Sequence, residues 1–171
     1  MVVLRPTRKL LHSLPLTPGP LPASDTALGD WYVNRLVVDH RPLLLLLSSQ
    51  SLLAVITPAR DVRALAIHLP GMIAARLKRL GVPERLVAAE ISAMAPVVVA
   101  KTEDRSVLGT MVDFAKVIPF HLEVGGWDDT TLPFVELRLG ETPCRLARRF
   151  NEVIFPGEDS LKRLLARWPA A

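Results

Sequence analysis

The feature that most constrains the fold is the segment "PLLLLLSSQSLLAVITPA" at positions 42–59. It contains two apolar runs, Leu43 to Leu47 and Leu52 to Ile56, and the sequence Ser-Ser-Gln-Ser separates them. A helix that crosses a membrane needs roughly 20 consecutive apolar residues, and both runs are far shorter. Short apolar runs bounded by polar residues are typical of buried strands. We therefore predict two buried strands joined by a hairpin connection at 48–51, and no membrane span.

The flanking segments extend this sheet. In "WYVNRLVVD" the residues alternate from Trp31 to Leu36, which predicts a strand covered on one side. "HRP" at 40–42 is expected to turn the chain back, so that this strand and the two apolar runs form an antiparallel meander. Segments 2–7 ("VVLRPT") and 96–102 ("PVVVAKT") read as two further short strands, and "RKLLHSL" at 8–14 as one or two helical turns.

Between residues 57 and 94 the period of the apolar residues changes from two to about 3.6, which predicts helices. Pro70 and Gly71 interrupt the first of them, because proline removes a hydrogen bond and clashes with the preceding turn. We expect either a kink or two short helices there. Gly81 suits a left-handed helix end, and Pro83 suits the start of the next helix.

A charged turn at 102–106 leads into a third helical stretch, "SVLGTMVDFAKVI". Asp104 or Ser106 is the expected cap, because an oxygen there accepts hydrogen bonds from the first backbone amides. Gly109 is expected to let a neighbouring backbone approach closely. An alternative is that Arg105 and Ser106 bind an anion at this helix N-terminus. The two interpretations are compatible.

The last third of the sequence is less regular. A Gly-Gly turn is expected at 125–126, and the alternation over 134–139 slightly favours a strand over a helix. "GEDSLKRLLARW" at 157–168 predicts a final amphipathic helix, capped by Asp159 or Ser160. Its inward residues are expected to be Leu161, Leu164 and Leu165.

Length and composition place these elements in one unit. A chain of 171 residues with 50% apolar and 22% charged residues is able to bury one sizeable core. We predict a single α+β domain over 1–171, in which a small, mainly antiparallel sheet is packed by several helices. Four prolines and two glycines at 15–30 predict a flexible loop, not a domain boundary.

Residue types exclude several chemistries. Cys144 is the one cysteine, which excludes an internal disulfide and fits the cytoplasm. The first residues are too often interrupted by Arg and Lys to form a secretory signal. The four histidines are widely separated, so we expect no metal site, and without a glycine-rich phosphate loop we expect no cofactor.

Three smaller polar features have simple structural interpretations. Asp39-His40-Arg41 is expected to be a turn and not an acid–base site. Cys144 is expected to be a buried thiol and not a nucleophile. Asp128-Asp129 is expected to be a solvated turn or a helix cap and not a cation site.

The charge allows an anionic partner without requiring one. The net charge is +4 and the pI about 9.7, a mild excess that suits a nucleic acid or an acidic protein surface. The last part of the chain is the most basic, and its positive charge is either a solvated face or a phosphate-binding patch. The residues concerned are Arg145, Arg148, Arg149, Lys162, Arg163 and Arg167.

Four blocks together resemble an uncharacterised family of small bacterial proteins known as a domain of unknown function. They are "LRPTRKLL" at 4–11, "LGDWYVNRL" at 28–36, "RSVLGTMVDF" at 105–114 and "LRLGETPC" at 137–144. In the third block this chain has Val112 where the family pattern has Asn. The resemblance implies a bacterial, intracellular, single-domain protein and transfers no activity.

The blocks also supply the candidate binding residues, which we expect to converge on one cleft. They are Trp31, Tyr32, Asn34, Arg105, Ser106, Asp113 and Thr142. One hypothesis is a binding or regulatory protein with an anionic partner, contacted by the basic end and the Arg105 loop. The alternative is a small hydrolase or nucleic-acid-processing enzyme. It would use Asp113 and Arg105, with Asp39 or His40, around a pocket floored by Trp31. A mean hydropathy of +0.30 adds a third expectation, a homo-oligomer formed through apolar surface.

Overall fold

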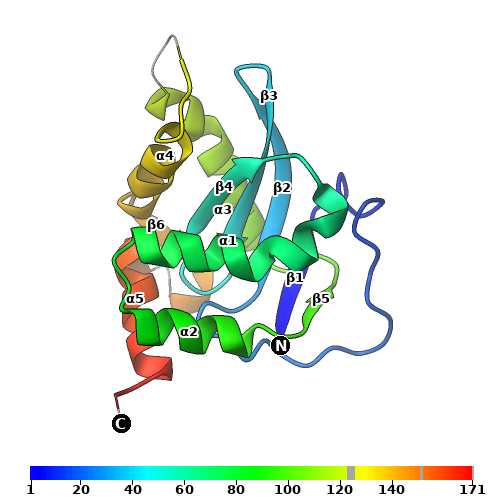
Figure 1. Cartoon of the computed structure of the whole chain (residues 1–171), viewed down its shortest axis with the longest axis vertical. Helices are drawn as coiled ribbons and strands as arrows, with labels where there is room; N and C mark the ends of the chain where they lie inside the picture. Colours follow the sequence, from blue (N-terminus) through cyan, green and yellow to red (C-terminus); the bar gives the residue numbers. More distant parts are fainter. Residues whose placement is uncertain (123–125, 151, 171) are drawn as a thin grey trace.

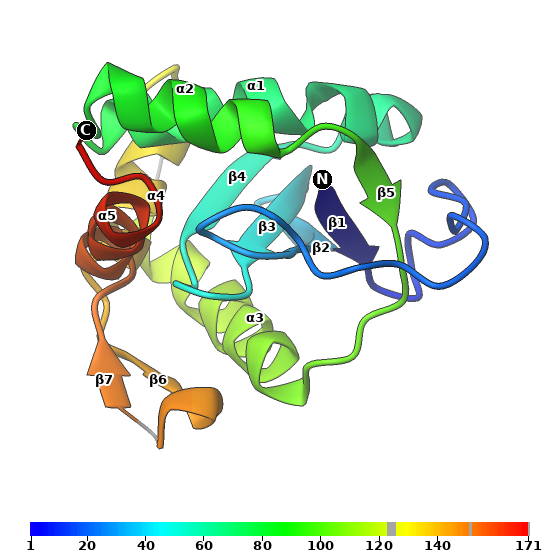
Figure 2. The same ribbon diagram turned by 90° about the horizontal axis from the view of Figure 1, so that it is seen from below.

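A five-stranded sheet lies between two layers of helices in the computed structural model, which describes residues 1–122, 126–150 and 152–170. Figure 1 shows α1 and α2 in front of the sheet with α3 behind it, and Figure 2 shows the same layers edge-on. A small two-stranded sheet lies beside them. The fold class predicted from the sequence, α+β, is confirmed.

The strand order in the main sheet is β4-β3-β2-β1-β5. Strands β2 (Trp31–Val38), β3 (Arg41–Ser48) and β4 (Ala54–Pro58) form the predicted antiparallel meander. Strand β1 (Val2–Pro6) lies between β2 and β5 (Val97–Val99) and runs parallel to both. The sheet is therefore mixed: the pairs of β1 with β2 and β5 are parallel, and the pairs within the meander are antiparallel. The two outer members of the parallel part, β2 and β5, are far from each other in the sequence.

Helices on opposite faces of the sheet belong to two different apolar clusters. One cluster joins the sheet to α1 and α2, and the other joins it to α3, α4 and the small sheet. Helix α5 contacts α2 and α4. The helices are α1 (Leu65–Arg79), α2 (Glu84–Ala93), α3 (Arg105–Val117), α4 (Thr131–Gly140) and α5 (Pro156–Arg167); the small sheet is β6 (Cys144–Leu146) with β7 (Glu152–Ile154); and short 3₁₀ helices cover Val62–Ala64, Ile118–His121 and Ala147–Arg149.

The leucine run explains why helices cover both faces. Leu44 and Leu46 of β3 pack in the cluster with α1 and α2, whereas Leu43, Leu45 and Leu47 pack in the cluster with α3 and α4. Successive side chains of a strand point to opposite faces, so an uninterrupted apolar strand needs a cover on each side.

Two buried charged side chains close the β4 edge of the sheet. Arg76 of α1 donates from Nε to the carbonyl oxygen of Ala54 at 3.0 Å. Glu136 of α4 accepts a hydrogen bond from the amide of Ile56 at 2.9 Å. These contacts satisfy backbone groups that an edge strand would otherwise expose to a further strand.

Hairpin geometry follows the predicted turns. Asp39 and His40 have φ values of 50° and 59°, as a two-residue hairpin turn of the type I′ class requires. The turn is thus made by these two residues, and Arg41 and Pro42 already belong to β3. The acid–base alternative for Asp39 or His40 has no further support in this geometry.

The strand favoured for 134–139 was wrong, because these residues belong to α4. Val135 and Leu139, four residues apart, are buried, whereas Leu137 is 47% exposed. The alternation in the sequence therefore does not correspond to an alternation of burial. A spacing of four residues with one apolar face is the pattern of a helix.

Other helix predictions needed smaller corrections. Pro70 lies in the second turn of a continuous α1, so two separate helices do not form. Gly109 is exposed, and no neighbouring segment lies within 4 Å of where its Cβ would be, so the expected close approach of another backbone does not occur. Residue 125 of the expected Gly-Gly turn lies outside the described residues.

The final helix also begins earlier than predicted. Phe155 is the N-cap of α5 and Pro156 is its first residue, so Asp159 and Ser160 lie inside the helix and do not cap it. Leu164 is buried as expected, but Leu165 is 45% exposed.

Candidate functional site

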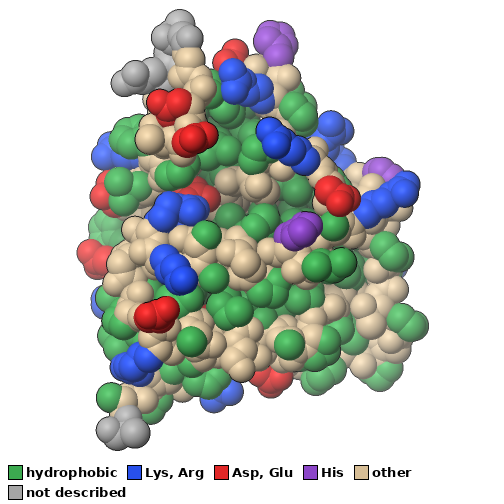
Figure 3. All heavy atoms as spheres, in the orientation of Figure 1, with side chains coloured by type: hydrophobic (Ala, Val, Ile, Leu, Met, Phe, Trp, Pro, Cys, Tyr) green, Lys and Arg blue, Asp and Glu red, His purple; other side chains and the backbone are tan. Residues whose placement is uncertain are grey.

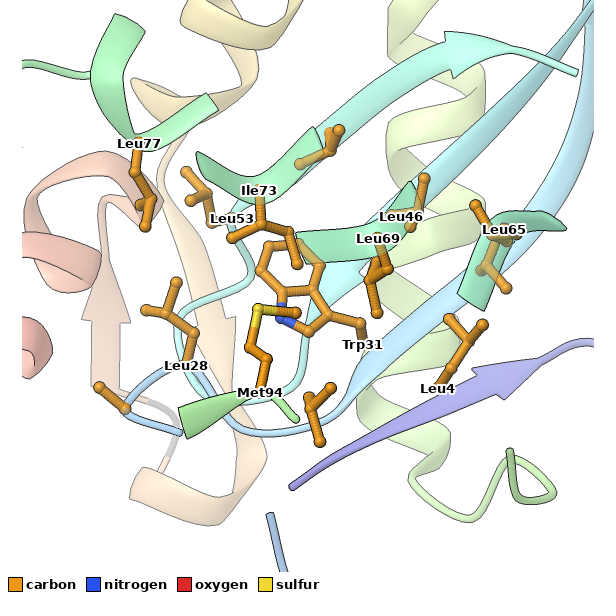
Figure 4. Packing of buried hydrophobic residues seen from close by; sticks show 14 of the residues in the cluster. Leu4, Leu28, Trp31, Leu46, Leu53, Leu65, Leu69, Ile73, Leu77 and Met94 are labelled. Atoms are coloured by element: carbon orange, nitrogen blue, oxygen red, sulfur yellow. The ribbon is translucent and has the colours of Figure 1, made fainter. Parts of the chain in front are cut away.

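Trp31, the expected floor of a pocket, is a core residue. It is 1% exposed and belongs to the cluster that joins the sheet to α1 and α2. Figure 4 shows its ring surrounded by Leu69, Ile73 and Met94. Helix α3 packs on the opposite face of the sheet, so Trp31 shares no pocket with Arg105 or Asp113 in the described part of the chain.

The two candidates that follow Trp31 on β2 have structural contacts. Tyr32 is buried in the other cluster, and its hydroxyl oxygen accepts a hydrogen bond from the amide of Asp104 at 3.0 Å. Burial raises the pKa of Tyr32. The Oδ1 of Asn34 accepts a hydrogen bond from the Thr7 hydroxyl at 2.9 Å. These contacts tie β2 to the start of α3 and to the end of β1.

Helix α3 carries three of the candidates at its surface. Asp104 is the N-cap, as predicted, and its Oδ1 accepts from the amide of Ser106 at 2.8 Å. Arg105 and Asp113 are exposed. Thr142 lies beyond α4 and donates to the carbonyl oxygen of Arg138 at 2.8 Å. The seven candidates are therefore distributed over both faces of the sheet and do not meet in one cleft.

Cys144 is a buried thiol and not an activated nucleophile. Burial raises its pKa to about 11, and the nearby negative charge of Asp113 adds to this effect. A nucleophilic cysteine needs a lowered pKa, because the thiolate is the reactive form. The same geometry does bring Asp113 close to the block that contains Thr142 and Cys144.

A polar groove of about 670 Å³ opens at the end of the sheet where β2 begins and β3 ends. Its walls come from segments that are distant in the sequence: β1, the loop at 21–30, the connection at 49–50, Glu103 and α5. In Figure 2 the loop crosses in front of the sheet, with α5 on the left and the segment that leads into α3 at lower right. Ligand pockets commonly have volumes between about 300 and 1,000 Å³.

Arg5 and Asp30 form the floor of this groove. The Nε of Arg5 donates to Asp30 Oδ2 at 2.5 Å, and both side chains are largely buried, at 12% and 16% exposure. The hydroxyl of Ser24 donates to Asp30 Oδ1 at 2.5 Å. The amide of Asp30 in turn donates to the hydroxyl oxygen of Ser49 at 2.9 Å. Arg5 and Ser24 thus fix the carboxylate of Asp30, and Ser49 fixes its backbone.

Gly29 permits this close packing. Its φ is +72°, and a Cβ at this position would lie 2.6 Å from the Ser49 hydroxyl oxygen and 2.6 Å from Cγ of Gln50. No other residue fits both the backbone conformation and the space. The geometry of the groove therefore explains Gly29 and Asp30 of the "LGD" sequence at 28–30.

Helix α5 supplies the positive wall. Arg163 donates from Nε to Asp159 at 2.7 Å and from Nη1 to Gln50 at 3.1 Å. Asp159 also binds Arg149 at 2.7 Å. Arg167 is exposed, donates to the carbonyl oxygen of Asp25 at 3.4 Å and lies over the Trp168 ring at 4.9 Å. Asp159 therefore shares its charge between Arg149 and Arg163, and both Arg163 and Arg167 line the groove.

Positive charge does not gather on the face that α1 and α2 cover. There Lys and Arg side chains are interspersed with acidic and apolar ones (Figure 3).

A second hollow, of about 470 Å³, is mostly apolar. Leu80, Leu137, Phe155 and Leu161 line it between the end of α1, α4 and α5. Leu137 and Phe155 are 47% and 44% exposed. Self-association through such a surface stays a prediction.

Sequence reasoning missed Arg5 and Asp30 as site residues. A signal was present, since Arg5 lies in the block "LRPTRKLL" and Asp30 in "LGDWYVNRL". Nothing in the sequence states that the two blocks are neighbours. That relation comes from the parallel pairing of β1 with β2, in which Leu4 lies opposite Trp31.

The described residues show neither a metal-ligand cluster nor a helix that could cross a membrane. They contain no group of three or more His, Cys, Asp or Glu side chains arranged to hold a metal ion. None of the helices in this part of the chain has the length and apolar character to cross a membrane.

Asp128 binds Thr130 and Thr131 next to α4, so the acidic pair is a turn, as expected. These hydrogen bonds lower the pKa of Asp128.

Comparison with known families identifies the class of protein as a domain of unknown function. The chain belongs to the family described as "Domain of unknown function (DUF6933)", which matches residues 3–159. The resemblance proposed from the four blocks is therefore confirmed at the level of the family. No curated protein and no solved structure matched the chain.

Proposed function

We propose that this protein is a non-enzymatic binding protein whose groove takes up a ligand with an anionic group. The observation that carries the proposal is the groove itself, to which Arg5, Arg163 and Arg167 contribute from opposite ends of the sequence. Guanidinium groups bind carboxylates and phosphates through paired hydrogen bonds. Two carboxylates, Asp30 and Glu103, also line the groove, which favours a small polar ligand over a uniformly charged polymer.

The polar side chains of the groove support a compact ligand. Ser24, Ser49 and Gln50 place hydroxyl and amide groups beside the arginines. Few, well-placed polar groups in a concave site fix the orientation of a ligand. A molecule the size of a nucleotide or of a sugar phosphate suits this volume and lining.

A thermal-shift series at low and moderate salt tests the proposal. Inorganic pyrophosphate, nucleoside monophosphates, short dicarboxylates and short oligonucleotides are compared, because a ligand of the folded state raises the melting temperature. We expect stabilisation by a small anion. If oligonucleotides alone act and their effect fades with salt, the partner is a nucleic acid instead. The absence of any shift at either salt concentration would reject an anion-binding groove.

Arg167→Gln and Lys162→Gln form the matched pair for this series. Both remove one positive charge from exposed positions of α5, but Arg167 lines the groove and Lys162 does not. The stabilisation is expected to fall in Arg167→Gln and to persist in Lys162→Gln. Equal losses would mean that the anion responds to net charge and not to the groove.

We also propose a cytoplasmic location in a bacterium. The support for the cytoplasm is Cys144, the one cysteine of the chain and a free, buried thiol, and the support for a bacterium is the resemblance of the four blocks. Cysteines remain reduced in that compartment.

A further inference from the structure

The guanidinium of Arg5 is held on three sides. Its Nε binds Asp30, its Nη1 donates to the carbonyl oxygen of Lys101 at 2.5 Å, and its Nη2 lies 2.8 Å from Glu103 Oε1. The first two partners are a largely buried carboxylate and a backbone carbonyl. The third is a glutamate on the segment that leads into α3.

The two carboxylates around Arg5 differ in how firmly they are held. Asp30 is 16% exposed, and a hydroxyl from Ser24 also binds it. The side chain of Glu103 is 65% exposed. Water and salt compete for the exposed carboxylate of Glu103, and Arg5, at 12% exposure, keeps the Asp30 carboxylate as a partner when Glu103 leaves. Glu103 can therefore leave Arg5 at small cost, and Asp30 cannot.

We propose that Glu103 occupies the position on Arg5 that the anionic group of the ligand takes, and that ligand binding displaces it. This inference rests on the proposed function of the groove. In the bound state a carboxylate or phosphate oxygen accepts from Nη2 of Arg5, while Arg163 and Arg167 face the ligand from the opposite wall. The Glu103 side chain turns into solvent.

Displacement sets the ligand class and lowers the apparent affinity. The arriving group must be an anion with an oxygen that accepts from Nη2 of Arg5, as a terminal phosphate or carboxylate does. The apparent affinity is the intrinsic affinity multiplied by the fraction of time that Glu103 is away from Arg5. Glu103 thus lowers the apparent affinity of every anion that displaces it by the same factor.

The test is a calorimetric titration of the full chain at low ionic strength with inorganic pyrophosphate, a nucleoside monophosphate and succinate. Glu103→Gln removes the competing charge and keeps the shape of the side chain. We expect this variant to bind the preferred anion roughly two- to threefold more tightly than the unaltered protein, with a smaller gain at moderate salt. The phosphate and carboxylate probes show which group the site prefers.

Glu84→Gln is the matched control, because Glu84 is an exposed glutamate that does not line the groove. It removes the same charge and is expected to leave the affinity unchanged. A gain of equal size in both variants would reduce the effect to net charge and overturn the inference.

The remaining outcomes separate this inference from the function on which it rests. If an anion binds the unaltered protein and Glu103→Gln with the same affinity, the groove binds anions but Glu103 is no competitor. If neither protein binds any of the probes, the proposed function itself fails.

Discussion

Arg76 with Glu136, and Arg5 with Asp30 and Glu103, are two arginine–carboxylate clusters with the same chemistry and different surroundings. Glu136 is 1% exposed, and it binds Arg79 at 2.6 Å and the amide of Ile56 at 2.9 Å. Burial lowers the pKa of Arg76. In the Arg5 cluster the two carboxylates differ in burial: Asp30 is largely buried, and Glu103 is exposed at the wall of a groove.

The difference teaches how to tell a structural ion pair from a candidate binding site. Around Glu136 the partners include backbone groups at the β4 edge, so the cluster completes the sheet. Around Arg5 one partner is exposed and replaceable, so the cluster is able to exchange that partner for a ligand. The four substitutions below test this contrast through the free energy of unfolding.

Glu136→Gln is expected to have the largest effect, a loss of about 3–5 kcal/mol. The amide NH₂ of the new side chain would face the donors of Arg79 or Ile56, and Arg76 would lose its countercharge. Urea unfolding followed by tryptophan fluorescence measures the loss. Glu141→Gln is the control, since Glu141 is exposed at the end of the same helix, and a change within about 0.5 kcal/mol is expected there. Similar losses for both would remove the special role of the buried cluster.

Gly29→Ala is expected to cost about 2–4 kcal/mol, because the methyl group would clash with Ser49 and Gln50 at a positive φ. Gly71→Ala is its matched control. Gly71 lies inside α1 with no atom within 4 Å of where its Cβ would be. There alanine is expected to stabilise by about 0.5–1 kcal/mol. Thermal melts of both variants check the opposite signs, and a neutral Gly29→Ala would contradict the close packing of the groove.

Asp30→Asn is expected to destabilise the chain by about 1–3 kcal/mol, less than the fully buried Glu136. The substitution keeps the shape of the side chain but removes the negative charge of the carboxylate to which Arg5 and Ser24 donate. Denaturant unfolding measures the loss, with the exposed Asp113→Asn as the reference, which is expected to stay within about 0.5 kcal/mol. A loss as large as that of Glu136→Gln would make the floor of the groove as structural as the β4 edge.

Glu103→Gln is expected to change the free energy of unfolding least, by about 0.5 kcal/mol or less. Its side chain is 65% exposed and screened by solvent. The same denaturant titration suffices. A loss as large as that of Asp30→Asn would show that Glu103 is needed to hold Arg5, and the contrast between fixed and replaceable partners would disappear.

Local patterns predicted the meander well and α4 poorly, for the same physical reason. The residues from Leu43 to Leu47 and from Leu52 to Ile56 are all buried, so apolar character and burial agree there. In α4 the exposed Leu137 and Phe134 broke the correspondence between apolar character and burial. Their exposure depends on what the rest of the chain leaves uncovered, which no local pattern contains.

The candidate site shows the same limit. Trp31 and Asp30 are adjacent, yet one side chain enters the core and the other the groove. Which neighbour faces which way is decided by the register of β2 on β1 and by the turn at Gly29. The blocks identified the right segments, but choosing residues within them required the three-dimensional arrangement.

The position of β1 has a consequence for how the chain is made. Its parallel partners are β2 and β5, and the second of these ends at Val99, after α1 and α2. On a ribosome the meander of β2, β3 and β4 finds its partners among neighbours, whereas one edge of β1 stays unpaired until β5 has been synthesised. The strand that emerges first is therefore among the last to be enclosed.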